Sequence, residues 1–264
     1  MRQQKTSKMW SLWMLLACCL FGLSWACQSA QEHDQQQAGI RIAVAANMQY
    51  AMQQLVEAYQ LQEEATIALV SGSSGKLTQQ ILHGAPFDIL VSADTAYPQK
   101  LAAAGLTLQQ PEVYAQGSLV LWTTQAALAL DTAGLVFSDP AVLHVALANP
   151  QTAPYGAAAW AWLQQRGLLE RVKPKLVVAE SISQASQFIG SGHASIGFTA
   201  KSVVLSEAMR DKGQWVALQG YPRIAQAAAL LKHAEESDVE LARDFYSFLY
   251  SDKAKEILKQ AGYQ

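Results

Sequence analysis

A run of serine and glycine, Ser71-Gly72-Ser73-Ser74-Gly75, followed by Lys76, has residue types that could do chemistry. It is not a phosphate-binding P-loop, because valine stands at position 70, where that motif needs its first glycine, and leucine follows Lys76, where it needs a hydroxyl. It is not the Gly-x-Ser-x-Gly turn of a serine hydrolase either. What remains is a turn whose backbone amides and hydroxyls can donate hydrogen bonds, either to the following helix as a cap or to a bound anion.

Three further positions place hydrogen-bond donors between the end of a predicted strand and the start of a predicted helix. They are Asn47, Tyr155-Gly156 and Ser181-Ile182. In open α/β sheets, ligands bind beyond the carboxyl ends of the strands, against the N-termini of the helices that follow. Together with Ser73-Ser74, these positions are therefore the candidate binding sites of the chain.

The usual catalytic and metal-binding motifs are missing from the sequence. The five histidines are scattered, and no His-Glu-x-x-His motif is present, so a zinc site of that kind is not expected. An exported serine hydrolase acting through Ser73 or Ser74 would need a histidine base, which no sequence feature supplies. We therefore expect a protein that is not an enzyme, with no catalytic residues and no cofactor.

The residues around the candidate positions alternate between predicted strands and helices. β-branched runs predict strands at residues 40–46, 67–70, 88–92, 117–123, 142–148, 175–179, 194–199 and 226–231. Helical spacing of apolar residues predicts helices at residues 48–60, after Gly75, and at 97–104, 154–163, 182–189, 239–250 and 254–261. We expect Asn47 to be the N-cap of the first helix. The alternating order implies an α/β fold with two sets of strands flanked by helices.

The first 27 residues have the pattern of a secretory signal peptide. Arg2, Lys5 and Lys8 form a basic start, and residues 9–26 are uncharged and mostly apolar. A retained membrane anchor is the alternative, because the apolar run is about long enough to cross a bilayer. Residues 28–39 are rich in glutamine and predict a flexible polar tether.

All three cysteines lie within this first segment, so the remaining chain can form no disulfide and no cysteine-bound metal site. Cys27 follows Ala26 at the end of the apolar run, as the lipid-modified cysteine does in bacterial lipoprotein signals. Trp25 fits that pattern poorly, so cleavage near Ala26 or Ala30 without lipidation stays open. We expect an exported, periplasmic protein, with lipid anchoring through Cys27 as one of two alternatives.

The charge of the chain excludes nucleic acid as its main partner. The 264 residues include 19 basic and 21 acidic side chains, a formal net charge of −2. Without the three basic residues of the signal segment, the charge is −5. A ligand held by bulk positive charge is therefore not expected. Because 51% of the residues are hydrophobic, the chain can bury a core, and its length allows one large or two medium domains.

Five segments resemble the sequence blocks of molybdate-binding proteins, which are substrate-binding components of ABC importers. They are residues 44–48 (VAANM) with 51–52, residues 72–77 (GSSGKL) with 84–89 (GAPFDI), residues 92–94 (SAD), residues 149–156, and residues 197–200 (GFTA). The blocks occur in the order and spacing of that family, between residue 40 and the C-terminus.

The resemblance implies a type II periplasmic-binding-protein fold, with two lobes and a ligand cleft between them. Each lobe would hold a parallel or mixed sheet flanked by helices. Lobe one would comprise residues 40–117 plus 225–264, and lobe two residues 118–224. The resemblance also implies a monomer that passes molybdate or tungstate to the permease of an ABC transporter in the inner membrane.

The resemblance further implies a set of ligand-binding residues. They are Asn47, Ser74 and, through their backbone amides, Tyr155 and Ile182, with Ser73 as an additional candidate. Some family members place a tyrosine hydroxyl after the strand that contains residues 197–199, but this chain has Ala200 there. Some members also have serine at position 47. These differences leave the number of contacts open.

The chemistry of the implied ligand matches the donor-rich turns. Molybdate and tungstate are fully deprotonated dianions at neutral pH, so they only accept hydrogen bonds. Hydroxyls, amides and helix N-termini supply donors without a lysine or arginine. A protonated phosphate would bring a hydrogen that finds no acceptor, whereas sulfate must be excluded by cavity size. A binding protein of the same fold for another anion, such as sulfate, and an exported serine hydrolase are the alternatives.

Overall fold

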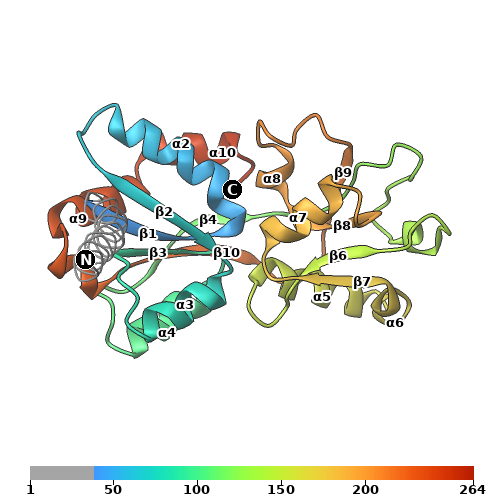
Figure 1. Ribbon diagram of the computed structural model, residues 1–264, viewed down its shortest axis with the longest axis horizontal. Helices are drawn as coiled ribbons and strands as arrows, with labels where there is room; N and C mark the ends of the chain where they lie inside the picture. Colours follow the sequence, from blue (N-terminus) through green and yellow to red (C-terminus); the bar gives the residue numbers. More distant parts are fainter. Residues whose placement is uncertain (1–38) are drawn as a thin grey trace, which may run out of the picture. The chain divides into compact units, whose positions relative to one another are not determined.

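The structure is a computed structural model that describes residues 39–264 (Figure 1). The predicted signal peptide at 1–27, the lipidation candidate Cys27 and residues 28–38 of the predicted tether lie outside the described residues. Within residues 39–264, no helix has both the length and the apolar character needed to span a bilayer.

The first sheet has five strands in the order β2-β1-β3-β10-β4. Strands β1 (Ile40–Ala45), β2 (Ile67–Gly72) and β3 (Ile89–Ser92) run parallel to one another. Strand β10 (Ile224–Leu230) is antiparallel to β3 and to the edge strand β4 (Glu112–Gly117). The sheet is therefore mixed, and its last two strands come from distant parts of the chain.

Helices cover both faces of this sheet. Helices α2 (Gln49–Gln60), α9 (Val239–Phe248) and α10 (Asp252–Gln260) pack on one face, and α3 (Ser74–Leu82) and α4 (Ala96–Ala103) on the other (Figure 1). In α2 the buried residues recur at helical spacing and form one apolar stripe. They are Ala51, Met52, Leu55, Val56 and Tyr59. The short 3₁₀ helices of this half of the molecule are η1 (Ala46–Met48) and η4 (Lys232–Glu236).

The second sheet also has five strands, in the order β7-β6-β8-β5-β9. Strand β6 (Val145–Ala148) is parallel to β7 (Leu176–Ala179) and to β8 (Ile196–Ala200), while β5 (Leu119–Thr123) is antiparallel to β8 and to β9 (Gln214–Ala217). The flanking helices are α5 (Pro154–Gln165), α6 (Leu169–Val172), α7 (Ile182–Gly190) and α8 (Lys201–Val204), with the 3₁₀ helices η2 (Leu135–Ser138) and η3 (Lys173–Lys175).

The chain passes between the two sheets twice. Only Ser118 separates the end of β4 from the start of β5, and residues 218–223 lead from β9 back to β10. We call the first sheet with its helices lobe one and the second sheet with its helices lobe two. Two mixed sheets, each flanked by helices, make up the two-lobed α/β architecture that the sequence predicts.

Strands β4 and β9 have no counterpart in the sequence prediction. Both lie at the edge of their sheet, where a strand pairs on one side only and needs no continuous apolar run. Their sequences, EVYAQG and QWVA, accordingly mix polar and apolar residues. The prediction of one strand over residues 117–123 is wrong at its start, because Gly117 ends β4 and β5 begins at Leu119.

Candidate functional site

A small cavity between the two lobes brings the predicted ligand-binding residues together. Its wall consists of Ala45, Ala46, Asn47, Ser73, Ser74 and Ala93 from lobe one and of Ala153, Pro154, Tyr155 and Ile182 from lobe two. The empty volume of this cavity is about 200 Å³. Pockets for drug-sized organic ligands have volumes of roughly 300–1,000 Å³, so this one is better matched to a small ion.

Three helices begin at the wall of this cavity. Ser74 is the first residue of α3, Ile182 is the first of α7, and Tyr155 is the second of α5. Backbone N–H groups in the first turn of a helix have no acceptor within the helix. Because the first residue of α5 is proline and has no N–H, Tyr155 carries the first N–H of that helix. Both lobes thus direct backbone donors, and the positive ends of helix dipoles, toward the cavity.

Ser73 differs from other serines that precede a helix in this structure. It is the N-cap residue of α3, yet its side chain makes no cap hydrogen bond. The serines at the N-caps of α7 and α10, Ser181 and Ser251, each accept a backbone N–H. Ser73 Oγ is buried and has no hydrogen-bond partner, which costs about 1–3 kcal/mol for such a group. Since Ser73 lines the cavity, this hydroxyl is available to a ligand there.

Ser74 Oγ, in contrast, already has one partner. It accepts a hydrogen bond from the backbone N–H of Ala93 at 3.0 Å. A hydroxyl that accepts one bond still has its own hydrogen to donate. The loop after β3 therefore orients Ser74 as a donor, which is the role that an anion requires.

Asn47 lines the cavity, but its side chain is engaged elsewhere. The prediction that it is the N-cap of the first helix is wrong, because Asn47 is the middle residue of η1 and makes no cap hydrogen bond there. Its Nδ2 donates to Gln226 Oε1 at 2.8 Å and to Tyr263 Oη at 2.9 Å. Both side-chain N–H groups are thus used, and the donor that remains for a ligand is the backbone N–H.

Tyr155 and Ile182 are buried at the cavity, with exposed fractions of 2% and 4%. The Tyr155 hydroxyl lies against Gly117, where an added Cβ would clash with the oxygen. Burial raises the pKa of this hydroxyl well above its usual value, so it stays protonated. Ala200, at the end of β8, is buried and does not line the cavity, so position 200 supplies no contact there.

None of the residues that line this cavity carries a charge. An ion pair joins the two lobes near the cavity, with Lys76 Nζ and Glu180 Oε1 2.6 Å apart. Lys76 is two residues from Ser74 in sequence, and Glu180 is two residues from Ile182. Both side chains are about half exposed, and such pairs contribute roughly 0–1 kcal/mol. The site would therefore hold an anion by hydrogen bonds and helix dipoles, without a counter-charge.

Hydrogen bonds between the lobes surround the cavity. Gly75 N donates to Thr152 O at 2.9 Å, and Ser183 Oγ donates to Ala46 O at 3.3 Å. The contact at Gly75 is tight, because an added Cβ would lie 2.6 Å from Tyr97 Oη and 2.9 Å from Thr152 O. The two lobes therefore meet closely at the start of α3, beside the cavity.

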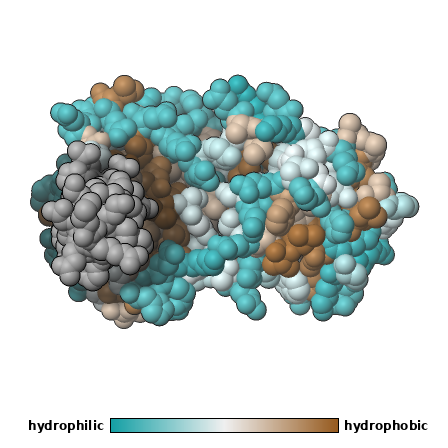
Figure 2. Space-filling view, in the orientation of Figure 1, coloured by the Kyte–Doolittle hydropathy of each residue, from teal (hydrophilic) through white to brown (hydrophobic). Residues whose placement is uncertain are grey.

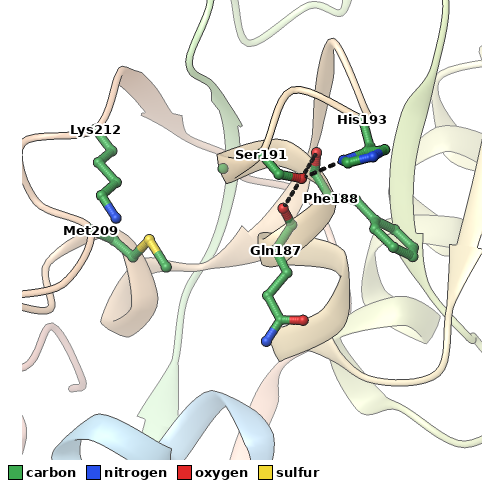
Figure 3. A pocket seen from close by; sticks show the side chains of 7 residues that line it. Gln187, Phe188, Ser191, His193, Met209 and Lys212 are labelled. Atoms are coloured by element: carbon green, nitrogen blue, oxygen red, sulfur yellow. Dashed lines mark hydrogen bonds between the residues drawn. The ribbon is translucent and has the colours of Figure 1, made fainter.

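A larger cavity, with an empty volume of about 840 Å³, lies in lobe two at the C-terminal end of α7 (Figure 3). Ser191 Oγ donates to Gln187 O at 2.7 Å and lies 2.7 Å from His193 Nδ1, so these polar groups are engaged with one another. The end of a helix presents carbonyl oxygens and the negative end of its dipole. Lys212 also lines this second cavity, but no helix within residues 39–264 begins at its wall, so it lacks the converging backbone donors of the first cavity.

The described part of the chain contains no group of three or more His, Cys, Asp and Glu side chains that could hold a metal ion. It does contain one serine–aspartate–histidine cluster. Asp88 Oδ1 accepts a hydrogen bond from Ser237 Oγ at 2.6 Å and lies 2.8 Å from His233 Nδ1. A catalytic triad places the histidine between the other two residues, whereas here the aspartate is in the middle. The cluster therefore joins segments of lobe one and does not activate the serine.

Sequence reasoning missed three buried residues behind the cavity, namely Gln226, Tyr263 and Ser202. All three form hydrogen bonds with Asn47. Gln226 gave a usable signal, because a single amide in the otherwise apolar strand IAQAAAL must find buried partners. Ser202 and Tyr263 gave none, since nothing in their local sequence distinguishes them from surface residues.

The comparison with known families is decisive for the class of protein. A family model described as bacterial extracellular solute-binding protein matches residues 40–264. The chain belongs to this family. The members of this family are binding proteins rather than a class of enzymes, and they are extracellular, which supports export of this solute-binding protein.

Individual relatives of this solute-binding protein are named for molybdate. The molybdate-binding protein ModA of Azotobacter vinelandii is 36% identical over 231 residues, which cover 86% of this chain and 90% of that protein. ModA of Rhodobacter capsulatus is 36% identical over 223 residues, covering 84% and 86%. The solved periplasmic molybdate-binding protein of A. vinelandii matches with a TM-score of 0.79 at 33% identity, covering 85% of this chain and 98% of that one. The resemblance found in the sequence is thus confirmed.

Proposed function

We propose that this protein captures molybdate, and also tungstate, outside the cytoplasm and delivers it to the permease of an ABC importer. The observation that carries this proposal is a small cavity between two lobes whose wall has no charged residue and contains hydrogen-bond donors from both lobes. Relatives at 36% identity that are named molybdate-binding proteins support the same ligand.

Several donors must converge on the anion, because burying an uncompensated ion would cost tens of kcal/mol. Each helix start contributes roughly 0.3–2 kcal/mol, and each hydrogen bond to a charged group roughly 1.5–3 kcal/mol. Ser73, whose hydroxyl is unpaired, is the proposed replacement for the tyrosine contact that Ala200 cannot make. The proposed ligand-binding groups are the hydroxyls of Ser73 and Ser74 and the backbone N–H groups of Asn47, Tyr155 and Ile182.

The donor set favours an anion that carries no proton. Ser74 Oγ is already occupied as an acceptor by the Ala93 N–H, and backbone N–H groups only donate. The hydrogen of a protonated phosphate could therefore be accepted only at a serine hydroxyl, chiefly that of Ser73, which the proposal needs as a donor to the anion. Sulfate carries no proton at neutral pH, but it is smaller than molybdate, so its oxygens would lie farther from donors that are fixed on two lobes.

Calorimetric titration of the purified protein with four anions tests the proposal. We expect one molybdate or one tungstate to bind per chain, phosphate to bind at least about tenfold more weakly because its hydrogen meets a site made mainly of donors, and sulfate to bind more weakly as well. Equal affinity for sulfate and molybdate would instead favour the alternative of a sulfate-binding protein with the same fold.

Capture and delivery follow from the position of the cavity between the lobes. Donors from lobe one and from lobe two can reach the same anion only when the lobes are together. A ligand that contacts both lobes shifts the population toward that closed arrangement. The permease would then recognise the closed, loaded form.

We propose that the protein has no catalytic role and is a monomer. None of the histidines in residues 39–264 lines the cavity that contains Ser73 and Ser74, so neither serine has a histidine there to act as a general base. Figure 2 shows a face with mostly hydrophilic or neutral residues and separate hydrophobic patches. The exposed large hydrophobic side chains are spread over distant segments, as is normal for a monomer. They are Leu61, Val70, Val113, Leu135, Leu143 and Val178.

The domain limits remain part of the proposal. A signal peptide would comprise residues 1–27 and a flexible tether residues 28–39. Lobe one would comprise residues 40–117 plus 225–264, and lobe two residues 118–224. Export to the periplasm fits the family, and attachment to a membrane through Cys27 is the finer alternative.

A test of the anchor uses Cys27→Ser. If Cys27 is lipidated, this variant should move from the membrane fraction to the soluble exported fraction, because several acyl chains on one N-terminus anchor firmly whereas a single chain anchors only marginally. Molybdate affinity should not change, since every proposed ligand group lies beyond residue 40. Mass spectrometry of the native N-terminus decides the matter, and an unmodified start downstream of Cys27 would mean ordinary signal cleavage.

A further inference from the structure

A buried set of hydrogen bonds lies behind Asn47 and joins the end of the chain to both lobes. Its members are Asn47, Gln226 and Tyr263 from lobe one and Ser202 from lobe two, with exposed fractions of 1%, 0%, 3% and 5%. Side chains that are buried and fully hydrogen-bonded in this way fix one another in place.

Tyr263 Oη is at the centre of this set. It accepts a hydrogen bond from Asn47 Nδ2 at 2.9 Å, and its own hydrogen can go to Asn47 O at 2.9 Å or to Ser202 Oγ at 3.0 Å. Ser202 Oγ in turn donates to Asn47 O at 2.8 Å. Asn47 is thus held both at its side chain and at its backbone carbonyl. Burial raises the pKa of the Tyr263 hydroxyl well above its usual value, so it remains a donor.

The C-terminal tail directs Tyr263 into this position. Gly262 has a φ of +91°, a conformation that favours glycine, and it turns the chain at the end of α10. Gln264 N then donates to Gln116 O at 2.9 Å, and Gln116 N donates to Gln264 O at 2.6 Å, so the last residue pairs with β4. The tail is therefore fixed on both sides of Tyr263.

We infer that Tyr263 is a positioning residue of the anion site, which holds the Asn47 backbone toward the ligand and ties it to lobe two through Ser202. The inference rests on the proposed function. Without the Tyr263 hydroxyl, Asn47 would lose a partner at Nδ2 and a partner at its carbonyl, in a buried setting where unpaired groups are costly. Asn47 lines the cavity, so a shift of its backbone would move its N–H away from the anion.

The link through Ser202 predicts which rate constant changes. Because Ser202 belongs to lobe two, its bonds to Asn47 and Tyr263 hold the lobes in the closed arrangement. Losing them should destabilise the closed, loaded form and leave the first encounter of the anion with the protein unchanged. Dissociation should therefore become faster, with little effect on association.

The test compares Tyr263→Phe with Tyr114→Phe. Tyr114 is also a buried tyrosine of lobe one, but its hydroxyl has no hydrogen-bond partner, so its removal breaks no bond. Affinity for molybdate would be measured by calorimetry, dissociation by stopped-flow tryptophan fluorescence, and Tm without ligand by calorimetric melting. We expect Tyr263→Phe to weaken binding by about fivefold or more through faster dissociation, and Tyr114→Phe to bind as the unchanged protein does.

A second variant, Ser202→Ala, keeps the test decisive if Tyr263→Phe does not fold. It should also speed dissociation, and an unchanged dissociation rate in Ser202→Ala would overturn the inference. A lower Tm in Tyr263→Phe with an unchanged dissociation rate would overturn it as well, because it would show a merely structural role. If the unchanged protein binds neither molybdate nor tungstate, the proposed function fails and the inference with it. If it binds and both variants match it, the inference alone fails.

Discussion

Ser73→Ala should weaken molybdate binding by about tenfold to a hundredfold without lowering the stability of the unliganded protein. The hydroxyl has no partner in the structure, so its removal breaks no bond within the protein and relieves a buried unpaired group. In the loaded protein the same change removes a hydrogen bond to a dianion, which contributes roughly 1.5–3 kcal/mol. Calorimetric titration gives the affinity, and thermal melting without ligand gives the stability.

Thr78→Val is the matched control for this change. Thr78 lies one turn further along α3, is fully buried, and likewise has a hydroxyl without a partner, but it does not line the cavity. Valine should therefore leave both stability and molybdate affinity nearly unchanged. Equal affinities for Ser73→Ala and the unchanged protein would place the anion away from Ser73.

Ser74→Ala should differ from both Ser73→Ala and Thr78→Val, because it also removes the acceptor of the Ala93 N–H and so lowers stability together with affinity.

Gly75→Ala should reduce molybdate affinity by at least about tenfold by holding the lobes apart. The new Cβ would lie 2.6 Å from Tyr97 Oη and 2.9 Å from Thr152 O. The tyrosine hydroxyl is the end of a flexible side chain and can move, whereas Thr152 O is backbone of lobe two and can move only with that lobe. Separation there would break the hydrogen bond from Gly75 N to Thr152 O and widen the cavity, so that donors of the two lobes could no longer reach the same anion.

The stability of lobe one should not suffer from this substitution. Gly75 is the second residue of α3 and has no positive φ, and alanine favours a helix over glycine by about 1 kcal/mol. A lower affinity with an unchanged or higher Tm would therefore locate the effect at the contact between the lobes. Gly190→Ala is the control, because its Cβ would meet only the Trp122 ring at an ordinary 3.5 Å. If Gly75→Ala binds molybdate as tightly as Gly190→Ala does, the loaded form does not have this close approach.

The sequence predicted those strands whose pattern of apolar residues directly reflects which of their faces are buried. The strands β1, β3, β6 and β8 lie inside their sheets, and they are short apolar runs because both faces are buried. The edge strands β4 and β9 pair on one side only, and their mixed sequences carry no such pattern. β4 and β9 are recognised only by what they pair with, whereas the edge strands β2 and β7 keep the β-branched runs that predicted them.

In the candidate site, too, features set by local sequence could be predicted and features set by distant residues could not. The positions of Tyr155 and Ile182 at helix starts were predictable, because a helix that follows a strand after a short loop leaves its first N–H groups unpaired near the end of that strand. The role of the Asn47 side chain was not, since its partners lie 179 and 216 residues away. For Ser73 the sequence allowed either a helix cap or a ligand contact, and the absence of a cap in the structure favours the second.

A cavity without lysine or arginine also affects how the anion leaves. An ion pair would keep attracting the anion after the lobes separate, because a fixed positive charge acts over several ångströms. Hydrogen bonds lose their strength within a fraction of that distance, and the field of a helix end falls off within its first turn. If the protein binds molybdate as proposed, separating the lobes would remove all donors of one lobe from the anion together, and water would replace them. The open protein would then bind the anion only weakly. The permease would need only to separate the lobes, because no lysine or arginine in the cavity would retain the anion afterwards.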